Sequence, residues 1–233
     1  MIQENLHTIQ THIQEATQQI GRQSKEVTLL AVSKTQPIEL IEELYNYGVR
    51  DFGENKVQEL LRKQSCMPAD TRWHMIGHLQ RNKVKYIAPF IHCIHSVDSL
   101  RLAETINAEA MKCNRIIDIL VEVNVAQEDS KFGISLDEVT PLVYKLSKLM
   151  HIRVVGLMTI APYVEDSEQN RPIFRKLRQK SVDIATQNID NTYMSVLSMG
   201  MSNDYIVAIE EGATIVRVGT SLFGIRNYNI KNE

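Results

Sequence analysis

Short apolar segments alternate with amphipathic ones along most of the chain. Eight segments have the length and β-branched content of buried strands: Val27–Ser33, Asp51–Gly53, Trp73–Gly77, His92–His95, Ile116–Asn124, Arg153–Leu157, Tyr193–Leu197 and Thr214–Val218. The stretches between them repeat apolar residues with the helical period: Pro37–Tyr47, Asn55–Gln64, Arg81–Ala88, Ser99–Cys113, Leu136–Met150, Glu168–Asn188 and Asn203–Glu210. This alternation predicts βαβ units, and eight repeats within 233 residues favour a closed, TIM-type (β/α)8 barrel over an open sheet.

A further amphipathic helix is predicted ahead of the first strand, in residues 1–21. Its apolar face consists of Ile2, Leu6, Ile9, Ile13 and Ile20. Gly21 is expected to end it.

Three later junctions carry helix-start signals. Pro37 is placed at the first helical position, where its missing N–H costs nothing. Ser135 with Glu138 has the pattern of a capping box, and Ser202 is a candidate cap for the last predicted helix.

The composition is that of a globular protein without a strong charge field. Hydrophobic residues make up 43% and charged residues 23%, and 26 basic against 28 acidic residues leave a net charge of −2. Nucleic-acid and membrane partners are therefore not expected, and a bound phosphate must be held by a local site. No linker or composition shift divides the sequence, so residues 1–233 are interpreted as one domain.

The cysteines and the amino terminus indicate a reducing compartment. Cys66, Cys93 and Cys113 are odd in number and form no C-x-x-C pair, which argues against a disulfide framework. The first residues lack the regions of a secretory signal, and apolar runs such as Leu29–Val32 are far shorter than the ~20 residues that span a bilayer. A cytoplasmic protein is expected.

In a β/α barrel, chemistry is performed at the carboxyl ends of the strands. The first strand ends in Ser33 and Lys34, after the apolar run Leu29–Val32. A lysine inside an apolar barrel mouth loses hydration, which lowers the pKa of its amine and suits it to Schiff-base chemistry. The equally weighted alternative is a lysine that extends from the strand end into solvent.

The loops after the seventh and eighth strands, residues 198–204 and 217–221, contain the small residues of a phosphate site. Arg217 has apolar neighbours in the eighth strand and needs an acceptor, either a structural ion-pair partner or the ring nitrogen of a bound heterocycle. A strand-end lysine, two phosphate loops and this arginine together suggest an aldehyde cofactor bearing a phosphate, namely pyridoxal 5′-phosphate (PLP).

A metal site is not expected, although His74, His78, His92, Cys93 and His95 are of metal-ligating types. Side chains alternate along a strand, so His92 points away from Cys93 and also diverges from His95. One ion could not easily gather them.

Six motifs then carry a family resemblance, in order along the chain: Leu30-Ala31-Val32-Ser33-Lys34-Thr35, Phe52-Gly53-Glu54-Asn55, Trp73-His74-Met75-Ile76-Gly77-His78-Leu79-Gln80-Arg81-Asn82-Lys83, Gly156-Leu157-Met158-Thr159-Ile160, Leu197-Ser198-Met199-Gly200-Met201-Ser202 and Val216-Arg217-Val218-Gly219-Thr220-Ser221-Leu222-Phe223-Gly224. From about Val27 to Arg226 the sequence resembles the pyridoxal phosphate homeostasis protein family. These are single-domain relatives of the alanine racemase barrel, fold type III of PLP proteins.

The resemblance implies a role for each matching residue. Lys34 matches the lysine that forms the Schiff base, and Arg217 the arginine that faces the pyridine nitrogen. The phosphate cup is matched by Ser198, Ser202, Gly219 and Thr220. Pocket positions are matched by Asn55, His78, Met158, Met199 and Met201, the two last with filling of the barrel mouth as the alternative. Lys131 resembles a second lysine near the cofactor entrance, where relay of the aldehyde and a solvated loop cation are both open.

The resemblance also bears on catalysis. The racemase relatives carry an added C-terminal β domain, and the partner subunit supplies a tyrosine as second base; this chain is expected to lack that domain. Racemisation needs acid–base groups on both faces of the carbanion. Tyr163, Tyr205 and His78 are conceivable substitutes, but nothing in the sequence places one opposite Lys34.

The leading hypothesis is therefore a PLP-binding protein of intracellular PLP homeostasis, which binds, buffers or delivers the cofactor without efficient catalysis. It is expected to be a monomer, with apo PLP-dependent enzymes as recipients. A PLP-dependent, racemase-like enzyme is the alternative, and a phosphosugar-type barrel enzyme without PLP is the third hypothesis.

Overall fold

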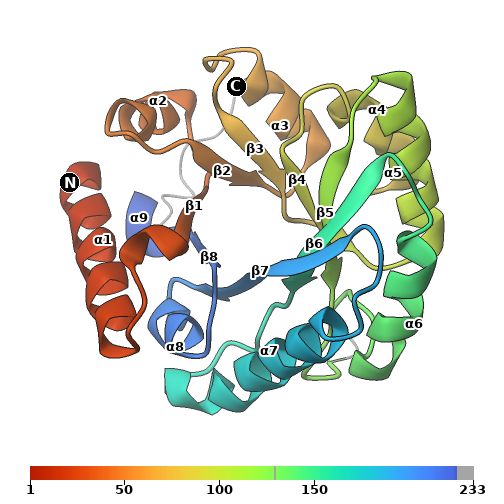
Figure 1. The fold of residues 1–233 in the computed structure, drawn as a ribbon. Helices are drawn as coiled ribbons and strands as arrows, with labels where there is room; N and C mark the ends of the chain where they lie inside the picture. The colour runs from red at the N-terminus through yellow and green to blue at the C-terminus, as the bar shows by residue number, and fades with distance from the viewer. Residues whose placement is uncertain (129, 225–233) are drawn as a thin grey trace.

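The computed structural model describes residues 1–128 and 130–224 and shows eight parallel strands in a closed barrel (Figure 1). Their order around the barrel is their order in the chain: β1 (Thr28–Val32), β2 (Asp51–Glu54), β3 (Arg72–Met75), β4 (Cys93–Val97), β5 (Ile117–Glu122), β6 (Ile152–Met158), β7 (Thr192–Met201) and β8 (Ile215–Val218). The barrel closes where β8 pairs with β1 in register, Leu30 beside Arg217. The predicted (β/α)8 barrel and its eight strands are confirmed. The prediction of one domain over 1–233 includes residues outside the described ones and stays a prediction.

The predicted helices surround the barrel: α2 (Ile38–Asn46), α3 (Val57–Gln64), α4 (Val84–Ile87), α5 (Leu100–Lys112), α6 (Leu136–Leu146), α7 (Arg171–Ala185) and α8 (Tyr205–Glu210). Three 3-10 turns accompany them: η1 (Ser24–Glu26), η2 (Arg81–Lys83) and η3 (Ser167–Asn170). After β8 comes the single turn α9 (Thr220–Phe223), which the apolar pattern does not predict. None of the helices in the described ranges combines the length and the apolar character needed to cross a bilayer.

Helix α1 (Ile2–Gln19) covers the place where a helix following β8 would lie, between α2 and α8 (Figure 1). Its buried face is apolar as predicted, and two hydrogen bonds attach it, Asn5 Nδ2 to the Leu222 carbonyl (3.0 Å) and His12 Nδ1 with the Tyr205 hydroxyl (2.7 Å). Ile20 is an exception: it follows the helix and is 38% exposed, because Gly21 with φ of 70° already turns the chain away.

Two of the predicted helix starts need correction. Pro37 lies one residue before α2 with extended backbone, because α2 begins at Ile38. The capping box of Ser135 and Glu138 is confirmed, whereas Ser202 does not cap α8. Asp204 takes the N-cap position, and the Ser202 oxygen accepts hydrogen bonds from another loop.

The two faces of the barrel strands differ in chemistry. Outward side chains such as Ala31, Phe52 and Val216 join one apolar cluster with the helices. A second, smaller apolar cluster, Cys93, Leu120, Val155 and Met158, has partly buried Ile160 and Val196 against it. Cys93 lies close to the inward histidines, so this cluster belongs to the barrel interior, which it shares with buried polar side chains.

Candidate functional site

Lys34 lies at the carboxyl end of β1, which we call the upper end of the barrel. It follows Ser33, whose hydroxyl donates a hydrogen bond of 2.6 Å to Glu54 Oε1 toward helix α3. Leu30 and Val32 share the inward face of β1, and Lys34 lies in the turn just beyond this strand. Its side chain is half-buried.

A buried ionic cluster supports the turn that carries Lys34. Lys63 of α3 donates to the Ser33 carbonyl (2.6 Å), to Glu54 Oε1 (2.7 Å) and to Glu59 Oε1 (2.7 Å). Burial raises the pKa of Glu54, while Lys63 acts in the opposite direction. The Thr35 N–H also donates to Glu59, so both sides of Lys34 are held by the same cluster. No sequence motif indicated this support.

Arg217 enters the barrel interior from β8. It is 4% exposed and donates to the Ser198 hydroxyl (2.7 Å) and to the Thr159 carbonyl at the end of β6 (2.8 Å). Burial lowers its pKa to about 10, against the opposing charges of Asp204 and Glu122, so it remains a cation at neutral pH. It is held as a charged donor below Lys34.

The loops after β7 and β8 meet at Ser202 and Gly219, and their role as a phosphate site stays a prediction. The Ser202 oxygen accepts from the N–H groups of Gly219 and Ser221, both at 3.3 Å, and Thr220 begins the short helix α9 beside them. Ser198 differs. Its side chain is fully buried and bonded to Arg217 and His95, so its hydroxyl lies inside the barrel rather than with Ser202.

Four of the predicted pocket residues lie in different surroundings. Met158 belongs to the interior cluster, and Asn55 lies after β2 with its Oδ1 buried and unpartnered among the described residues. Met201 is partly buried at the end of β7. Met199 is wrong as a pocket residue: it alternates with Ser198 and is fully buried in the outer cluster against the helices.

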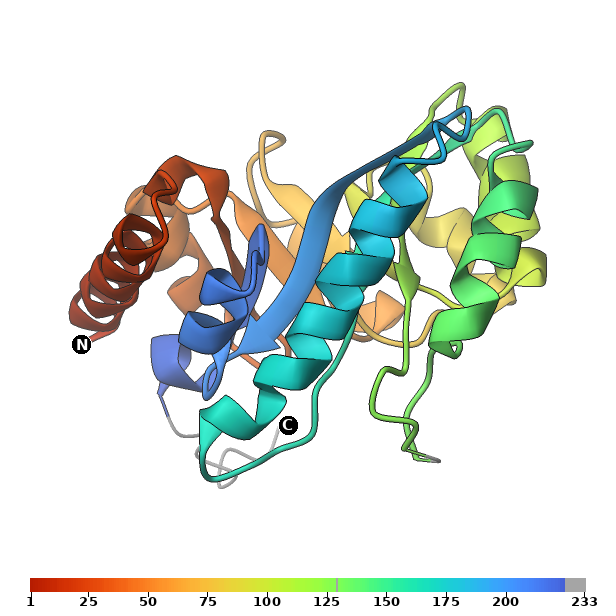
Figure 2. The same ribbon diagram turned by 60° about the horizontal axis from the view of Figure 1, so that its bottom comes forward.

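His78 and Lys131 come together at the upper end through the loop that follows β5. The His78 ring stacks on Phe132 with 4.2 Å between ring centroids and 15° between planes. Lys131 pairs with Glu128 (2.6 Å) and donates to the Ile160 carbonyl (3.4 Å). The loop after β5 extends beyond the barrel strands in Figure 2, and the stack on Phe132 links His78 to it, so we call this place the rim.

Glu122 is an interior residue that sequence reasoning missed. It ends β5, is 5% exposed, and its Oε2 has no hydrogen-bond partner in the described structure. Burial, aided by the charge of Asp98, raises its pKa to about 7, although Arg217 acts in the opposite direction. Its position two residues after Leu120 in a buried strand was the available signal, because alternation directs both inward.

Neither tyrosine considered as a second base reaches the site. Tyr205 is buried in the helix layer, where its hydroxyl bonds to His12 of α1, and Tyr163 is 85% exposed. Among the described residues, Glu122 is the buried carboxyl that acts electrostatically on Arg217 together with Asp204.

His92 and His95 lie in two different groups of potential metal ligands, as side-chain alternation predicts, but His74 belongs to both groups. His74, Cys93 and His95 offer ligand atoms within 4.8 Å of one another, and so do Asp51, His74 and His92. His74 already hydrogen-bonds to His95 and Asp51. The expected absence of a metal stays a prediction.

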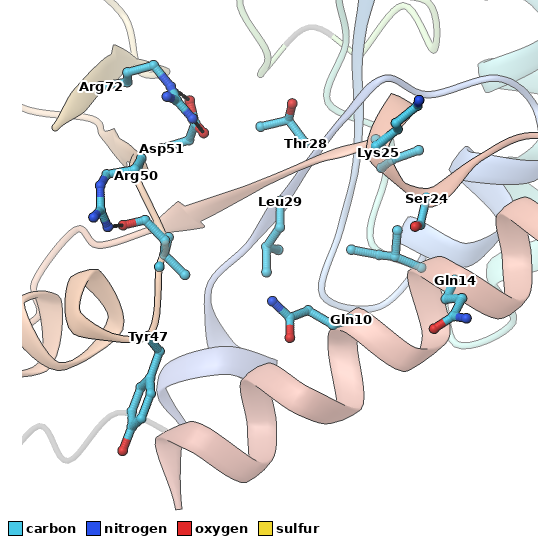
Figure 3. A pocket seen from close by; sticks show the side chains of 14 residues that line it. Gln10, Gln14, Ser24, Lys25, Thr28, Leu29, Tyr47, Arg50, Asp51 and Arg72 are labelled. Atoms are coloured by element: carbon cyan, nitrogen blue, oxygen red, sulfur yellow. Dashed lines mark hydrogen bonds and ion pairs between the residues drawn. The ribbon is translucent and has the colours of Figure 1, made fainter. Parts of the chain in front are cut away.

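Two cavities lie toward the amino-terminal, or lower, end of the barrel, away from Lys34. One of about 600 Å³ is lined by Asp51, His74 and His92 among others. The other, of about 480 Å³, separates α1 from β1 and the loop before β2 (Figure 3).

The closed barrel of eight parallel strands is a fold shared with alanine racemases. A model of the family described as alanine racemase, N-terminal domain, matches residues 5–227. The alanine racemase of Clostridium difficile 630 has a TM-score of 0.75 at 15% identity; the alignment covers 98% of this chain and 57% of that one, and it shows the shared fold alone.

Relatives of higher sequence identity define the family more narrowly. The pyridoxal phosphate homeostasis protein of Aquifex aeolicus is 46% identical over 226 residues, which cover 97% of this chain and 98% of the relative. The structure of PipY from Synechococcus elongatus PCC7942 with PLP bound has a TM-score of 0.83 at 33% identity and covers 96% of this chain and 100% of that one. The chain belongs to the pyridoxal phosphate homeostasis protein family.

Proposed function

We propose that this protein binds PLP at the upper end of the barrel, with Lys34 as the covalent attachment point. The carrying observation is that Lys34 follows β1, which pairs in register with β8, the strand of Arg217, at the end where the Ser202 and Gly219 loops meet. The PLP-bound structure of PipY, a relative of 33% identity, supports this ligand.

The residues present fit the group. The loops that meet at Ser202 and Gly219 have the small residues and backbone N–H groups that suit a phosphate, and the buried Asn55 Oδ1 and Glu122 Oε2, unpartnered among the described residues, are available as acceptors. Bound PLP supplies an aldehyde carbon that amines attack. The Lys34 amine forms a carbon–nitrogen bond there with loss of one water, for which it must be uncharged.

Arg217 then determines how the ring nitrogen is held. A guanidinium donates and cannot accept a proton, so it leaves that nitrogen unprotonated. The ring is consequently a weaker electron sink than it is beside a carboxylate. This environment favours binding of the cofactor over catalysis with it.

We therefore assign the protein to PLP homeostasis, the function in the name of its Aquifex aeolicus relative, through binding, buffering or delivery of the cofactor in the cytoplasm. Efficient racemisation is not proposed, because the Tyr205 hydroxyl bonds to His12 in the helix layer, Tyr163 is 85% exposed, His78 stacks on Phe132, and Glu122 lies on the side of Arg217. A monomer is proposed, with apo PLP-dependent enzymes as recipients.

Borohydride reduction of the PLP-loaded protein, followed by peptide mapping, tests the attachment. The label is expected on Lys34, and Lys34→Ala is expected to abolish the visible absorption band. Lys131→Ala is the matched control, because it removes a rim lysine and leaves Lys34 in place. A label on Lys131, or an unchanged band in Lys34→Ala, would contradict the assignment. Deuterium exchange at Cα of amino acids well above the rate with free PLP would favour the racemase-like alternative.

A further inference from the structure

Three side chains from neighbouring strands converge on the cavity of about 600 Å³ at the lower end of the barrel. Asp51 begins β2, His74 lies in β3 and His92 directly precedes β4. Each offers one ligand atom, a carboxylate oxygen or a ring nitrogen, and the three atoms lie within 4.8 Å of one another. All three residues line the cavity, which gives a dissolved ion a way to them.

The sequence-based expectation of no metal did not include Asp51. It rested on the alternation of side chains around His92, Cys93 and His95, and this alternation does keep His92 and His95 in different groups. Asp51 enters through the pairing of β2 with β3, where it lies beside Arg72, two residues before His74. The carboxylate and the two imidazoles therefore come together only in the closed barrel.

The closest pair already has nearly the spacing of two ligands on one ion. Asp51 Oδ1 and His74 Nε2 are 3.0 Å apart. Ligand atoms at about 2.0–2.1 Å from a tetrahedral zinc ion are about 3.4 Å from each other, so the ion fits after a movement of a few tenths of an ångström. His92 is exposed, and its ring centroid is 5.1 Å from that of His74. A change of side-chain rotamer brings an exposed ring of this kind toward the same point.

The ring of His74 is oriented from behind by buried residues. His74 Nδ1 is 2.9 Å from His95 Nε2, and His95 Nδ1 is 3.0 Å from Ser198 Oγ. With Nε2 bound to a metal ion, His74 keeps its proton on Nδ1 and donates it to His95, which in turn donates from Nδ1 to Ser198. Partners of this kind fix the tautomer and the plane of a ligating imidazole.

Asp51 is oriented and ionised before any ion binds. Arg72 donates to its Oδ1 (2.8 Å) and its Oδ2 (2.6 Å), and Figure 3 shows the two side chains together. Burial opposes ionisation of Asp51, but hydrogen bonds from Arg72 and His74 outweigh it and hold the pKa of that carboxyl well below its usual range. A metal ion replaces only the hydrogen bond from His74, so both bonds from Arg72 remain.

The charges around the cavity permit a divalent cation. Its lining contains two guanidinium groups, Arg22 and Arg72, and two carboxylates, Glu26 and Asp51. Arg72 is paired with Asp51 at 2.6 Å and Arg22 with Glu26 at 3.5 Å. The lining therefore has no net positive charge to exclude the ion, and the cavity has room for water at a fourth position.

The other group of potential ligands, His74, Cys93 and His95, suits an ion less well. Neither Cys93 nor His95 is among the described residues that line the two cavities. Burial, aided by the charge of Asp118, raises the pKa of the Cys93 thiol well above its usual value, so the sulfur keeps its proton. Metal ions bind the thiolate.

We propose that Asp51, His74 and His92 bind one divalent transition-metal ion of the zinc type at the lower end of the barrel, with His95 and Ser198 as positioning residues for His74. Two imidazoles and one carboxylate form a ligand set that suits zinc, with water in the fourth position. The site lies at the opposite end of the barrel from Lys34 and does not rest on the proposed PLP site.

Titration with Co²⁺ tests the site on the full chain, without a histidine tag and freed of metal and of PLP, because PLP absorbs visible light and itself binds metal ions. We expect one equivalent of Co²⁺ to give the visible bands of a low-coordinate ion without a thiolate band, and Zn²⁺ to displace it. Mg²⁺ prefers oxygen ligands and is not expected to compete. Absence of binding, a thiolate band or competition by equimolar Mg²⁺ would overturn the proposal.

Two ligand variants locate the ion. His92→Gln removes one ligand at an exposed position, so the fold is expected to be kept, and the Kd of Zn²⁺ measured by calorimetry should rise at least about tenfold. Asp51→Asn removes the carboxylate and should have an effect of the same size or larger. An unchanged Kd in His92→Gln would refute this ligand set.

Two matched controls test whether the loss is specific. His7→Gln removes an exposed histidine of α1 that belongs to neither ligand group. Asp118→Asn removes a carboxylate that pairs with Arg153 by bonds of 2.6 and 2.8 Å, as Asp51 pairs with its own arginine, and that also belongs to neither group. Both variants should keep the Kd of the unsubstituted chain. An equal loss of affinity in His7→Gln and His92→Gln would show scattered surface binding and overturn the proposal.

Ser198→Ala tests the positioning role. It removes the acceptor behind His95 without touching a ligand. The Kd of Zn²⁺ is expected to rise about tenfold, and the Co²⁺ bands to shift, because the His74 ring is no longer held in one plane. An unchanged Kd with unchanged bands would refute the positioning role of Ser198 and His95.

Discussion

Replacement of Glu122 by glutamine should stabilise the folded chain at alkaline pH and have almost no effect at acidic pH. Burial raises the pKa of Glu122 from 4.5 to about 7. A carboxyl whose pKa is raised by folding contributes its full stability below the unfolded value of 4.5, and that contribution is lost as the pH rises through about 7. At about 1.4 kcal/mol for each tenfold change in proton affinity, the loss amounts to about 3 kcal/mol.

Urea unfolding of both proteins without added ligand, from pH 4 to pH 8, measures this difference. The free energy of unfolding of Glu122→Gln should exceed that of the unsubstituted chain by about 3 kcal/mol more at pH 8 than at pH 4. Glu42→Gln is the matched control, because Glu42 is exposed on α2 and its carboxylate stays hydrated in both states, so its difference should be flat. A flat difference for Glu122→Gln as well would show that its carboxyl is not buried as an acid and would refute the reasoning.

Three further replacements test the packing around the site. Lys63→Met leaves the fully buried carboxylate of Glu54 without its cation. In urea unfolding we therefore expect the free energy of unfolding to fall by about 3–5 kcal/mol, and by more at pH 8 than at pH 5.5. Equal decreases at the two pH values would contradict this expectation. Gly156→Ala places a Cβ 1.8 Å from a carbonyl oxygen of β7, so it should lower the free energy of unfolding by more than about 3 kcal/mol or prevent folding. In Gly53→Ala the nearest atoms to the new Cβ are side-chain atoms at 3.0 Å or more, so the decrease should be smaller. Phe132→Ala removes the stack with His78 and should release bound PLP several-fold faster in a trapping assay; an unchanged rate would show that this stack does not retain the cofactor.

The fold could be predicted from the sequence because the period of apolar residues is a local property. The eight strands and the major helices each bury a face that is legible in their own segment, such as Ile2, Leu6, Ile9 and Ile13 in α1. The one-turn helix α9 and the exposure of Ile20 were not predicted. A single turn has no apolar period, and the end of α1 depends on how the backbone turns at Gly21.

Part of the candidate site could also be predicted from the sequence, for a different reason. Lys34, Ser202 and Gly219 follow strand ends and Arg217 is the last residue but one of β8, and the closed barrel brings strand ends together. The pocket role predicted for Met199 failed because one step along β7 reverses the face of a side chain, a parity that cannot be read without the register of the neighbouring strands.

By itself, then, the sequence determined the barrel, the family and the strand-end residues, since each depends on local pattern or matched motifs. Only the tertiary structure decided which residues support Lys34 and Arg217. The Lys63 cluster and the hydrogen bonds of His95 and Arg217 with Ser198 join residues from different strands and helices, up to 103 positions apart at His95 and Ser198. No local pattern encodes such contacts, because hydrogen bonds and burial depend on which side chains the closed barrel brings within 3 Å of one another.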